Sequence, residues 1–391
     1  MGQQWGKNGT KAGQKKWQKR GQTEITFNWL YILIAGGLIL LFFVGIVVKQ
    51  QARSETQLSF DVVRILESII KGASISEKTK NSIDISGLKD YTLYFSCEEG
   101  VSKYGLEGTS AQVEDVVQPV FSPTRIKAPR LNLWSIPYKL PYKTIDFLFV
   151  TSSTTKYFFV GQDENFVNEF FSQTEKELSG KKEVLFEIKR DFVTSVDVID
   201  PEKYFHIRIV DVGGNTIKAG DSVPQKLRSL EDGQVTAVSF TAGNTADFFQ
   251  KAGDTWMKRN KQPIYLISLG GERDAAKYAA IFAENEELYT CNMKKAFRRL
   301  QYVSEVYLEK LQEMEAYYDT PLRQVNYPDC IGNIKLFPTN LVERLELFQN
   351  KIAACAATYP EATASCTELR PLALTIQELN QELARNCATL Y

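Results

Sequence analysis

Histidine is almost missing from this sequence, because His206 is the only one among 391 residues. It lies in the strand-like run 204–212 and is interpreted as an ordinary strand residue. A Ser-His-Asp triad would need His206 itself, and zinc sites built from several histidines are excluded. The chain also lacks CxxC, GxxxxGK[ST], HExxH, GxSxG and EF-hand patterns. Since no paired acid, base and nucleophile emerge, we expect no enzyme, no cofactor and no metal site.

Negative charge is absent from the first 23 residues, which hold six lysines and arginines. The formal net charge of the whole chain is zero, so the remainder carries a net charge of about −6. A mildly acidic bulk argues against nucleic-acid binding, which requires a basic face. We therefore expect no nucleic-acid partner.

Charge of either sign is also missing from residues 27–48, a run of 22 residues. An apolar helix needs about 20 residues to cross a bilayer core, so this run predicts a single transmembrane helix in contact with lipid. The basic cluster precedes the run and predicts a cytoplasmic N-terminus and an extracellular C-terminal bulk. Because the run is too long for a secretory signal and ends without a small-residue cleavage site, it is expected to stay on the protein.

The boundary before this run carries Lys19, Arg20, Gly21, Gln22 and Glu24. A basic pair, a glycine, a glutamine and an acid before a long apolar helix resembles the class III (type IV prepilin-like) signal of archaeal pilins and archaellins. The resemblance covers roughly residues 15–50. It implies a prepilin-like peptidase as a partner, cleavage between Gly21 and Gln22, and other pilin-like subunits as further partners.

Composition and periodicity divide the chain into five segments. They are a basic, disordered leader at 1–21, a transmembrane and stalk helix at 22–72, an irregular β-rich segment at 73–143, an α/β domain at 144–286 and a helical region at 287–391. The stalk carries apolar residues at helical spacing (Leu58, Val62, Ile65, Leu66, Ile69 and Ile70). This stripe indicates either packing against the protein's own domain or a seam between subunits. Four prolines in 123–141 predict edges and turns there rather than long elements.

Short apolar strands between amphipathic helices predict a Rossmann-like or flavodoxin-like domain at 144–286. Its sheet is expected to be mainly parallel and covered on both faces, with helices at about 164–178, 245–260 and 273–284. Two loops suggest ligand binding. Thr241, Gly243, Asn244 and Thr245 follow a strand and precede an expected helix, which is similar to the phosphate loop of flavodoxins. Gly270 and Gly271 end the next strand in the same way. An ordinary strand-to-helix turn, with a glycine for the bend and an asparagine or threonine as N-cap, explains the first loop well without a ligand.

Two further polar stretches are interpreted as structural. Asp211-Val212-Gly213-Gly214-Asn215 is expected to be a hairpin loop rather than a cation site. Lys294, Lys295, Arg298 and Arg299 form a basic helix face that is expected to be solvated.

All six cysteines follow the predicted membrane span, as expected for disulfides in an oxidising compartment. Six cysteines allow 15 pairings. If the helices expected at 341–359 and 366–390 are antiparallel, their ends meet. Cys355 then faces Cys366, and Cys330 comes near Cys387, which leaves Cys97 with Cys291.

Three functional hypotheses follow. The first is a membrane-anchored, non-enzymatic surface protein with a pilin-like helix, either a minor pilin-like component or an adhesion or assembly factor. The second is a monomeric single-pass surface receptor or scaffold that binds a surface protein partner. The third, which the sequence favours least, is an exported flavin- or nucleotide-binding enzyme.

Overall fold

The computed structural model describes residues 60–72, 80–178, 184–335 and 340–391. The chain divides into the units Met1–Leu58 and Ser59–Tyr391, and every described residue belongs to the second unit. Within these ranges, no helix combines the length and the apolar character needed to span a bilayer. The predicted leader and the predicted span at 27–48 lie outside the described residues, as do Gly21, Gln22 and Glu24.

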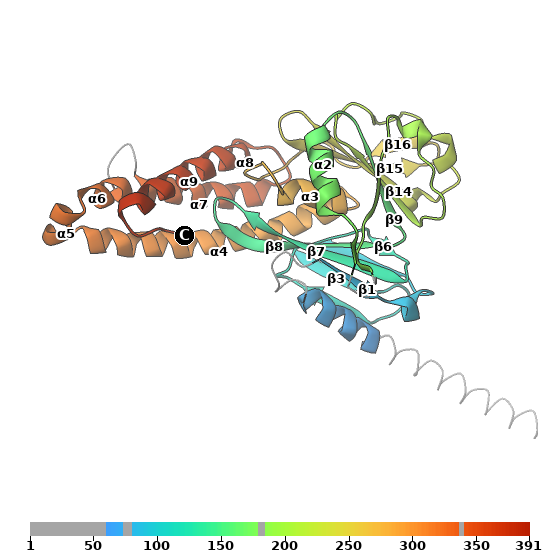
Figure 1. The fold of residues 1–391 in the computed structure, drawn as a ribbon, viewed down its shortest axis with the longest axis horizontal. Helices are drawn as coiled ribbons and strands as arrows, with labels where there is room; N and C mark the ends of the chain where they lie inside the picture. The colour runs from blue at the N-terminus through green and yellow to red at the C-terminus, as the bar shows by residue number, and fades with distance from the viewer. Residues whose placement is uncertain (1–59, 73–79, 179–183, 336–339) are drawn as a thin grey trace, which may run out of the picture. The chain divides into compact units, whose positions relative to one another are not determined.

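Two four-stranded sheets form the first part of the second unit (Figure 1). One has the order β1 (Lys80–Asp84), β7 (Arg130–Lys139), β8 (Lys143–Ser152), β5 (Val120–Phe121). The other has the order β4 (Gln112–Asp115), β3 (Val101–Leu106), β2 (Leu93–Glu98), β6 (Arg125–Ile126).

The helix at 60–72 buries most of its apolar stripe against these strands. Val62, Val63, Leu66 and Ile70 share one core with residues of β2, β3, β7 and β8. Ile65 remains 60% exposed. The stripe therefore packs against the protein's own domain, the first of the two alternatives that its periodicity left open.

The segment 73–143 contains a longer strand than its prolines predicted. β7 has ten residues and pairs along most of its length with β8, another ten-residue strand, which begins at Lys143 where the segment ends. Pro137 lies inside β7, but the pairing of β7 with β1 ends at Trp134. Proline has no N–H to donate, so it is tolerated where the described strands give β7 a neighbour on one side only. The prediction of short elements here was wrong.

A seven-stranded sheet follows, and it is mixed rather than mainly parallel. Its order is β12 (Lys189–Phe192), β9 (Thr155–Val160), β13 (His206–Asp211), β14 (Val235–Thr241), β15 (Thr245–Ala252), β16 (Thr255–Lys258), with β17 (Ile264–Tyr265) also paired to β15. The first four strands are parallel to one another, whereas β15, β16 and β17 pair antiparallel. The α/β class is therefore confirmed, and the expected dominance of parallel pairing is not.

The error came from residues 245–260, which were expected to be a helix and form β15 and β16 instead. Gly253 has a φ of 60° and provides the left-handed residue of the tight turn between these strands. Phe248 and Phe249 point into cores on opposite faces of the sheet, as neighbouring residues of a strand must. Two adjacent aromatic residues buried on both sides match a central strand and not an amphipathic helix.

Helices cover one face of this sheet. Phe166 and Phe170 of α2 (Glu164–Gln173) and most residues of α3 (Ala275–Phe282) share a core with Phe159 and Val210. On the other face, Ile207 and Ile209 pack with Val223 and with Leu227, which ends a short 3₁₀ helix (Gln225–Leu227). Coverage by helices on both faces was expected, but loops and short 3₁₀ helices supply the second layer in the described chain. A small hairpin, β10 (Glu177–Leu178) and β11 (Val184–Phe186), connects α2 with β12.

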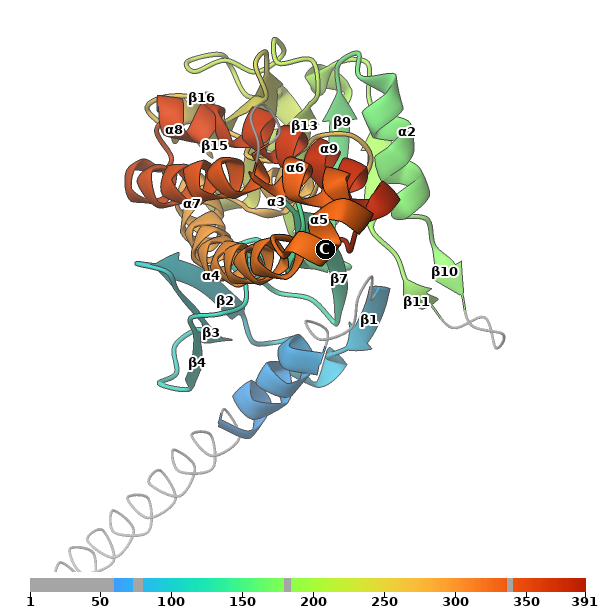
Figure 2. The ribbon, with the colours of Figure 1, turned by 90° about the vertical axis from the view of Figure 1, so that its left-hand side faces the viewer.

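The C-terminal region is helical. It comprises α4 (Glu286–Tyr318), α5 (Pro321–Asn326), α6 (Pro328–Lys335), α7 (Leu341–Thr358), α8 (Ala364–Thr367) and α9 (Leu369–Asn386). Figure 2 shows α7 lying between α4 and α9, and the two helices do contact it. The structure contains the disulfides Cys97–Cys291, Cys330–Cys387 and Cys355–Cys366, the same pairs as those expected from an antiparallel hairpin.

A buried lysine joins α4 to the N-terminal strands. Lys295 is only 2% exposed, and its Nζ donates to Ser102 Oγ at 2.6 Å and to the carbonyls of Asp115 and Gln118 at 2.7 and 3.1 Å. Burial lowers the pKa of Lys295 to about 8, with Asp115 opposing the shift and Arg298 adding to it. Lys295 was expected on a solvated basic face, and that expectation is wrong.

This lysine predicts a pH dependence. The unfolded chain keeps a proton on Lys295 up to about pH 10.4, whereas the folded chain releases it near pH 8. Stability therefore rises with pH in this window, by about 1.5 kcal/mol between pH 8 and 9.5. We expect Lys295→Met to lose this rise in urea denaturation, and Lys294→Met, a partly exposed neighbour, to keep it. Equal pH slopes in the wild type and Lys295→Met would contradict the assignment.

Candidate functional site

The first predicted ligand loop is a hairpin turn. Thr241 ends β14, Thr245 begins β15, and the two residues are register partners in the antiparallel pair. Gly243 and Asn244 between them have φ values of 80° and 61°. Because no helix begins here, the flavodoxin-like phosphate loop predicted for this stretch was wrong.

The second predicted loop does precede a helix. Gly270 and Gly271 lie between β17 and α3, with φ values of 74° and 89°. The hairpin turn at 241–245 contacts the segment between β17 and α3, because the Leu266 amide donates a hydrogen bond of 2.8 Å to the carbonyl of Asn244. Asn244, Gly270 and Gly271 line one cavity of about 800 Å³. The structure therefore brings these three predicted residues together, while Thr241, Gly243 and Thr245 are not among the lining residues.

Asp274 is the N-cap of α3. The Asp274 carboxylate accepts from the backbone N–H groups of Ala276 and Lys277, at 3.0 and 3.3 Å, and from the Ser268 hydroxyl at 2.7 Å. Burial raises the pKa of Asp274, and these hydrogen bonds partly oppose the shift. Because the protein's own carboxylate takes these N–H groups, this helix N-terminus is not free to hold a phosphate.

The charged residues between α2 and α3 are largely used to hold the two helices together. Glu169 accepts from the Tyr278 hydroxyl at 2.7 Å and from the Arg273 amide at 2.9 Å. The Nζ of Lys277 lies 3.0 Å from Asp163 and 3.6 Å from the centre of the Phe166 ring. These contacts fix the segment 268–274 against α2 and shape the cavities on either side of it.

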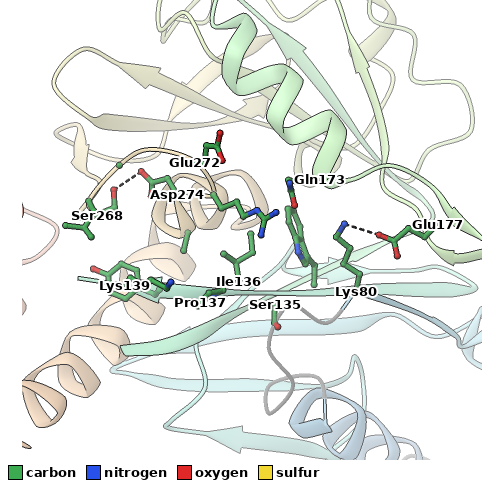
Figure 3. A pocket seen from close by; sticks show the side chains of 16 residues that line it. Lys80, Ser135, Ile136, Pro137, Lys139, Gln173, Glu177, Ser268, Glu272 and Asp274 are labelled. Carbon is green, nitrogen blue, oxygen red and sulfur yellow. Dashed lines mark hydrogen bonds and ion pairs between the residues drawn. The ribbon is translucent and has the colours of Figure 1, made fainter. Parts of the chain in front are cut away.

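A second cavity, of about 620 Å³, runs along β7 (Figure 3). Trp134, Ile136, Pro137 and Tyr138 of β7 are among its lining residues. Figure 3 shows an ion pair between Lys80 and Glu177 at one end, with the Lys80 Nζ 3.0 Å from Glu177 Oε1. The Ser268–Asp274 hydrogen bond lies at the other end.

The size and lining of this cavity suit the binding of a ligand. A volume of this size falls within the range of about 300–1,000 Å³ that is usual for ligand pockets. The lining residues combine aromatic and aliphatic surface with side chains of both signs, among them Lys139, Glu272 and Arg273. Such a pocket can take an amphipathic segment or ligand, because apolar contacts give affinity and the charged ends give orientation.

His206 lies at the start of β13, a strand position as predicted. It is 4% exposed, and its Nε2 lies 3.2 Å from Thr236 Oγ1 and 4.0 Å from Glu284 Oε2. Burial, and secondarily the charge of Arg208, lower the pKa of His206 to about 3. The imidazole is therefore neutral near pH 7 and serves in packing.

Few of the residues that line the β7 cavity could have been identified from the sequence. Asp274 was recognisable in principle, because an aspartate before an alanine-rich helix is a favoured N-cap. Lys80 and Trp134 were not, since they reach the cavity only through the pairing of β1 with β7. No protein-family model matches the chain, and no curated protein or solved structure matches it either.

Proposed function

We propose that this chain is a membrane-anchored cell-surface protein that acts by binding. In this proposal residues 27–48 cross the membrane once, the basic N-terminus is cytoplasmic and the disulfide-bonded unit is extracellular. The pilin-like junction at Gly21 and Gln22 suggests a minor pilin-like component or an adhesion or assembly factor of an archaeal cell surface.

The observation that carries the proposal is the use of the cysteines. The sequence has six cysteines, and all six form disulfides in the structure. Thiols of cytosolic proteins are kept reduced, whereas disulfides persist in oxidising compartments. Because every cysteine follows residue 48, export of the unit after the apolar run explains both the pairing and the charge asymmetry.

One observation favours the alternative of a monomeric single-pass receptor or scaffold. A filament seam needs the apolar stripe of the stalk to face another subunit. In the structure, Val62, Leu66 and Ile70 are buried in the core of their own domain, and Ile65 is the member of the stripe that is largely exposed among the described residues. This arrangement leaves little of the described stalk for a neighbouring subunit.

The proposal predicts a defined mature N-terminus. We expect intact-mass measurement of the protein extracted from its native membrane to show a chain that begins at Gln22. Replacing Gly21 with valine is expected to block the cleavage, and the matched change Gly13→Val, in the same basic leader, to leave it intact. Retention of residues 1–21 in the native protein would remove the pilin-like assignment. Protection of the C-terminal unit from protease on intact cells would remove the surface location as well.

The two forms of the proposal differ in assembly. An Ile65→Cys variant carries a new thiol at a position that is 60% exposed, while every native cysteine is disulfide-bonded. A pilin-like filament gives a ladder of crosslinked multimers with a thiol-specific crosslinker, whereas a monomeric receptor gives none. Val198→Cys, at a position 57% exposed in the short 3₁₀ helix after β12 (Val196–Val198), is the matched control for non-specific crosslinking.

A further inference from the structure

The parallel part of the seven-stranded sheet has a topological switch point. From β9 the chain passes through α2 to β12 on one side, whereas from β13 it continues to β14 on the other side. The connections after β9 and β13 therefore diverge between two neighbouring parallel strands. In open α/β sheets, ligands bind in the crevice outside the carboxyl ends of such strands.

A cavity of about 670 Å³ occupies this place. It is lined by residues that follow the carboxyl ends of β9, β12 and β13, among them Gln162, Thr194 and Thr216. Glycines bring two of these loops into contact. A Cβ on Gly161, whose φ is 111°, would lie 2.5 Å from the amide nitrogen of Gly213, a distance that no side chain tolerates. Part of the wall is therefore backbone, because the two loops touch at Gly161 and Gly213.

The lining combines polar and apolar groups and carries no positive charge. It presents the amides of Gln162 and Asn215, the hydroxyls of Thr194 and Thr216, and the carboxylate of Glu164. No lysine, arginine or histidine occurs among the lining residues in the described chain. One aromatic ring, that of Phe192, also lines the cavity and is 45% exposed.

The loop after β13 offers no site for a phosphate. The Asp211 carboxylate is fully buried and accepts from the amides of Gly213, Gly214, Thr216 and Ile217, at 2.8–3.3 Å, and from the Ser239 hydroxyl at 2.8 Å. The turn was expected to be a hairpin, but β13 and β14 are parallel, so it opens a crossover instead. Because the N–H groups of this loop already donate to the Asp211 carboxylate, they are not free to bind the phosphate of a nucleotide or another phosphate.

We propose that this switch-point crevice binds a neutral polyhydroxylated ligand, a sugar residue of a glycan. Amide, hydroxyl and carboxylate groups together can donate to and accept from neighbouring hydroxyls of a sugar ring. The exposed ring of Phe192 supplies an apolar face against which the C–H face of the sugar stacks. The inference does not depend on how the chain is anchored, since all of these residues belong to the described unit.

The test is saturation-transfer NMR on the full chain in a detergent without a sugar head group. The probes are glucose, galactose, mannose and N-acetylglucosamine at millimolar concentration, with inorganic phosphate followed separately by ³¹P line broadening. We expect transfer to at least one sugar and no broadening of phosphate. Phe192→Ala is expected to weaken sugar binding about tenfold through loss of the stacking contact.

Phe60→Ala is the matched control, because Phe60 is 46% exposed and lies on the helix at 60–72. It should leave the sugar signal unchanged. The proposal is overturned if none of the four sugars receives saturation. It is equally overturned if phosphate binds in the crevice, or if Phe192→Ala retains full binding. Circular dichroism of each variant separates loss of binding from loss of fold.

Discussion

Replacing Arg208 with methionine is expected to destabilise the folded protein by about 4 kcal/mol. Arg208 lies in the middle of β13 and is 1% exposed. Its guanidinium donates four hydrogen bonds of 2.7–3.1 Å to the carbonyls at and after the C-terminal end of α3, those of Ala280, Ile281, Ala283 and Glu284.

The size of the effect follows from what the substitution leaves behind. The last carbonyls of a helix have no partner within the helix, and a buried acceptor without a partner costs about 1–3 kcal/mol. Methionine fills a similar volume but donates nothing, so the carbonyls lose their donors at once. Burial lowers the pKa of Arg208 to about 10, so the guanidinium is still charged near pH 7 and favours the negative end of the α3 dipole.

Urea denaturation followed by circular dichroism measures this loss. Arg125→Met is the control, because Arg125 is 53% exposed and pairs with Glu107 at 2.6 Å on the surface. An exposed ion pair contributes about 0–1 kcal/mol, so this variant should unfold close to the wild type. If Arg208→Met also unfolded within about 1 kcal/mol of the wild type, Arg208 would not be the donor that holds the end of α3.

Local sequence patterns predicted the elements in which one pattern, either helical spacing or a continuous apolar run, holds along the whole length. The 33-residue α4 follows from apolar residues at spacings of three and four, and β9 and β13 follow from continuous apolar runs. Pattern-based prediction failed at 245–260, because the apolar residues of this short stretch fit both strand alternation and helical spacing. The stretch forms a strand because it pairs with β14, and the fold, not local propensity, brings these two strands together.

The candidate sites were predictable only in part. Asn244, Gly270 and Gly271 were identified because glycine and asparagine mark turns, and turns at strand ends gather at one edge of a sheet. Lys80 and Trp134 were not identified, since nothing near them in the sequence indicates the loop 268–274 that faces them across the cavity. Arg208 is visible in the sequence as a charged residue inside an apolar strand, but nothing in the sequence indicates which carbonyls it binds.

Removing the disulfides one pair at a time is expected to give a graded series of losses. In the loop-closure description, a crosslink limits the entropy of the unfolded chain more strongly as the loop it closes grows longer. The sequence separations are 194 for Cys97–Cys291, 57 for Cys330–Cys387 and 11 for Cys355–Cys366. The corresponding losses on replacement of both cysteines by alanine are about 5, 4 and 3 kcal/mol.

The order of these losses distinguishes two explanations, chain entropy and packing, because the disulfide that closes the shortest loop is more deeply buried than the one that closes the longest. Cys355 and Cys366 are fully buried, whereas Cys97 and Cys291 retain 6% and 7% exposure. If packing decided the cost, the pair Cys355→Ala with Cys366→Ala would be the most damaging, since it would leave the least accessible cavity. If chain entropy decides it, Cys97→Ala with Cys291→Ala causes the largest loss, although Lys295 still joins α4 to the same strands through Ser102. Urea denaturation of the three double variants in one buffer gives the ranking, and a short-loop pair that costs as much as the long-loop pair contradicts the entropic account.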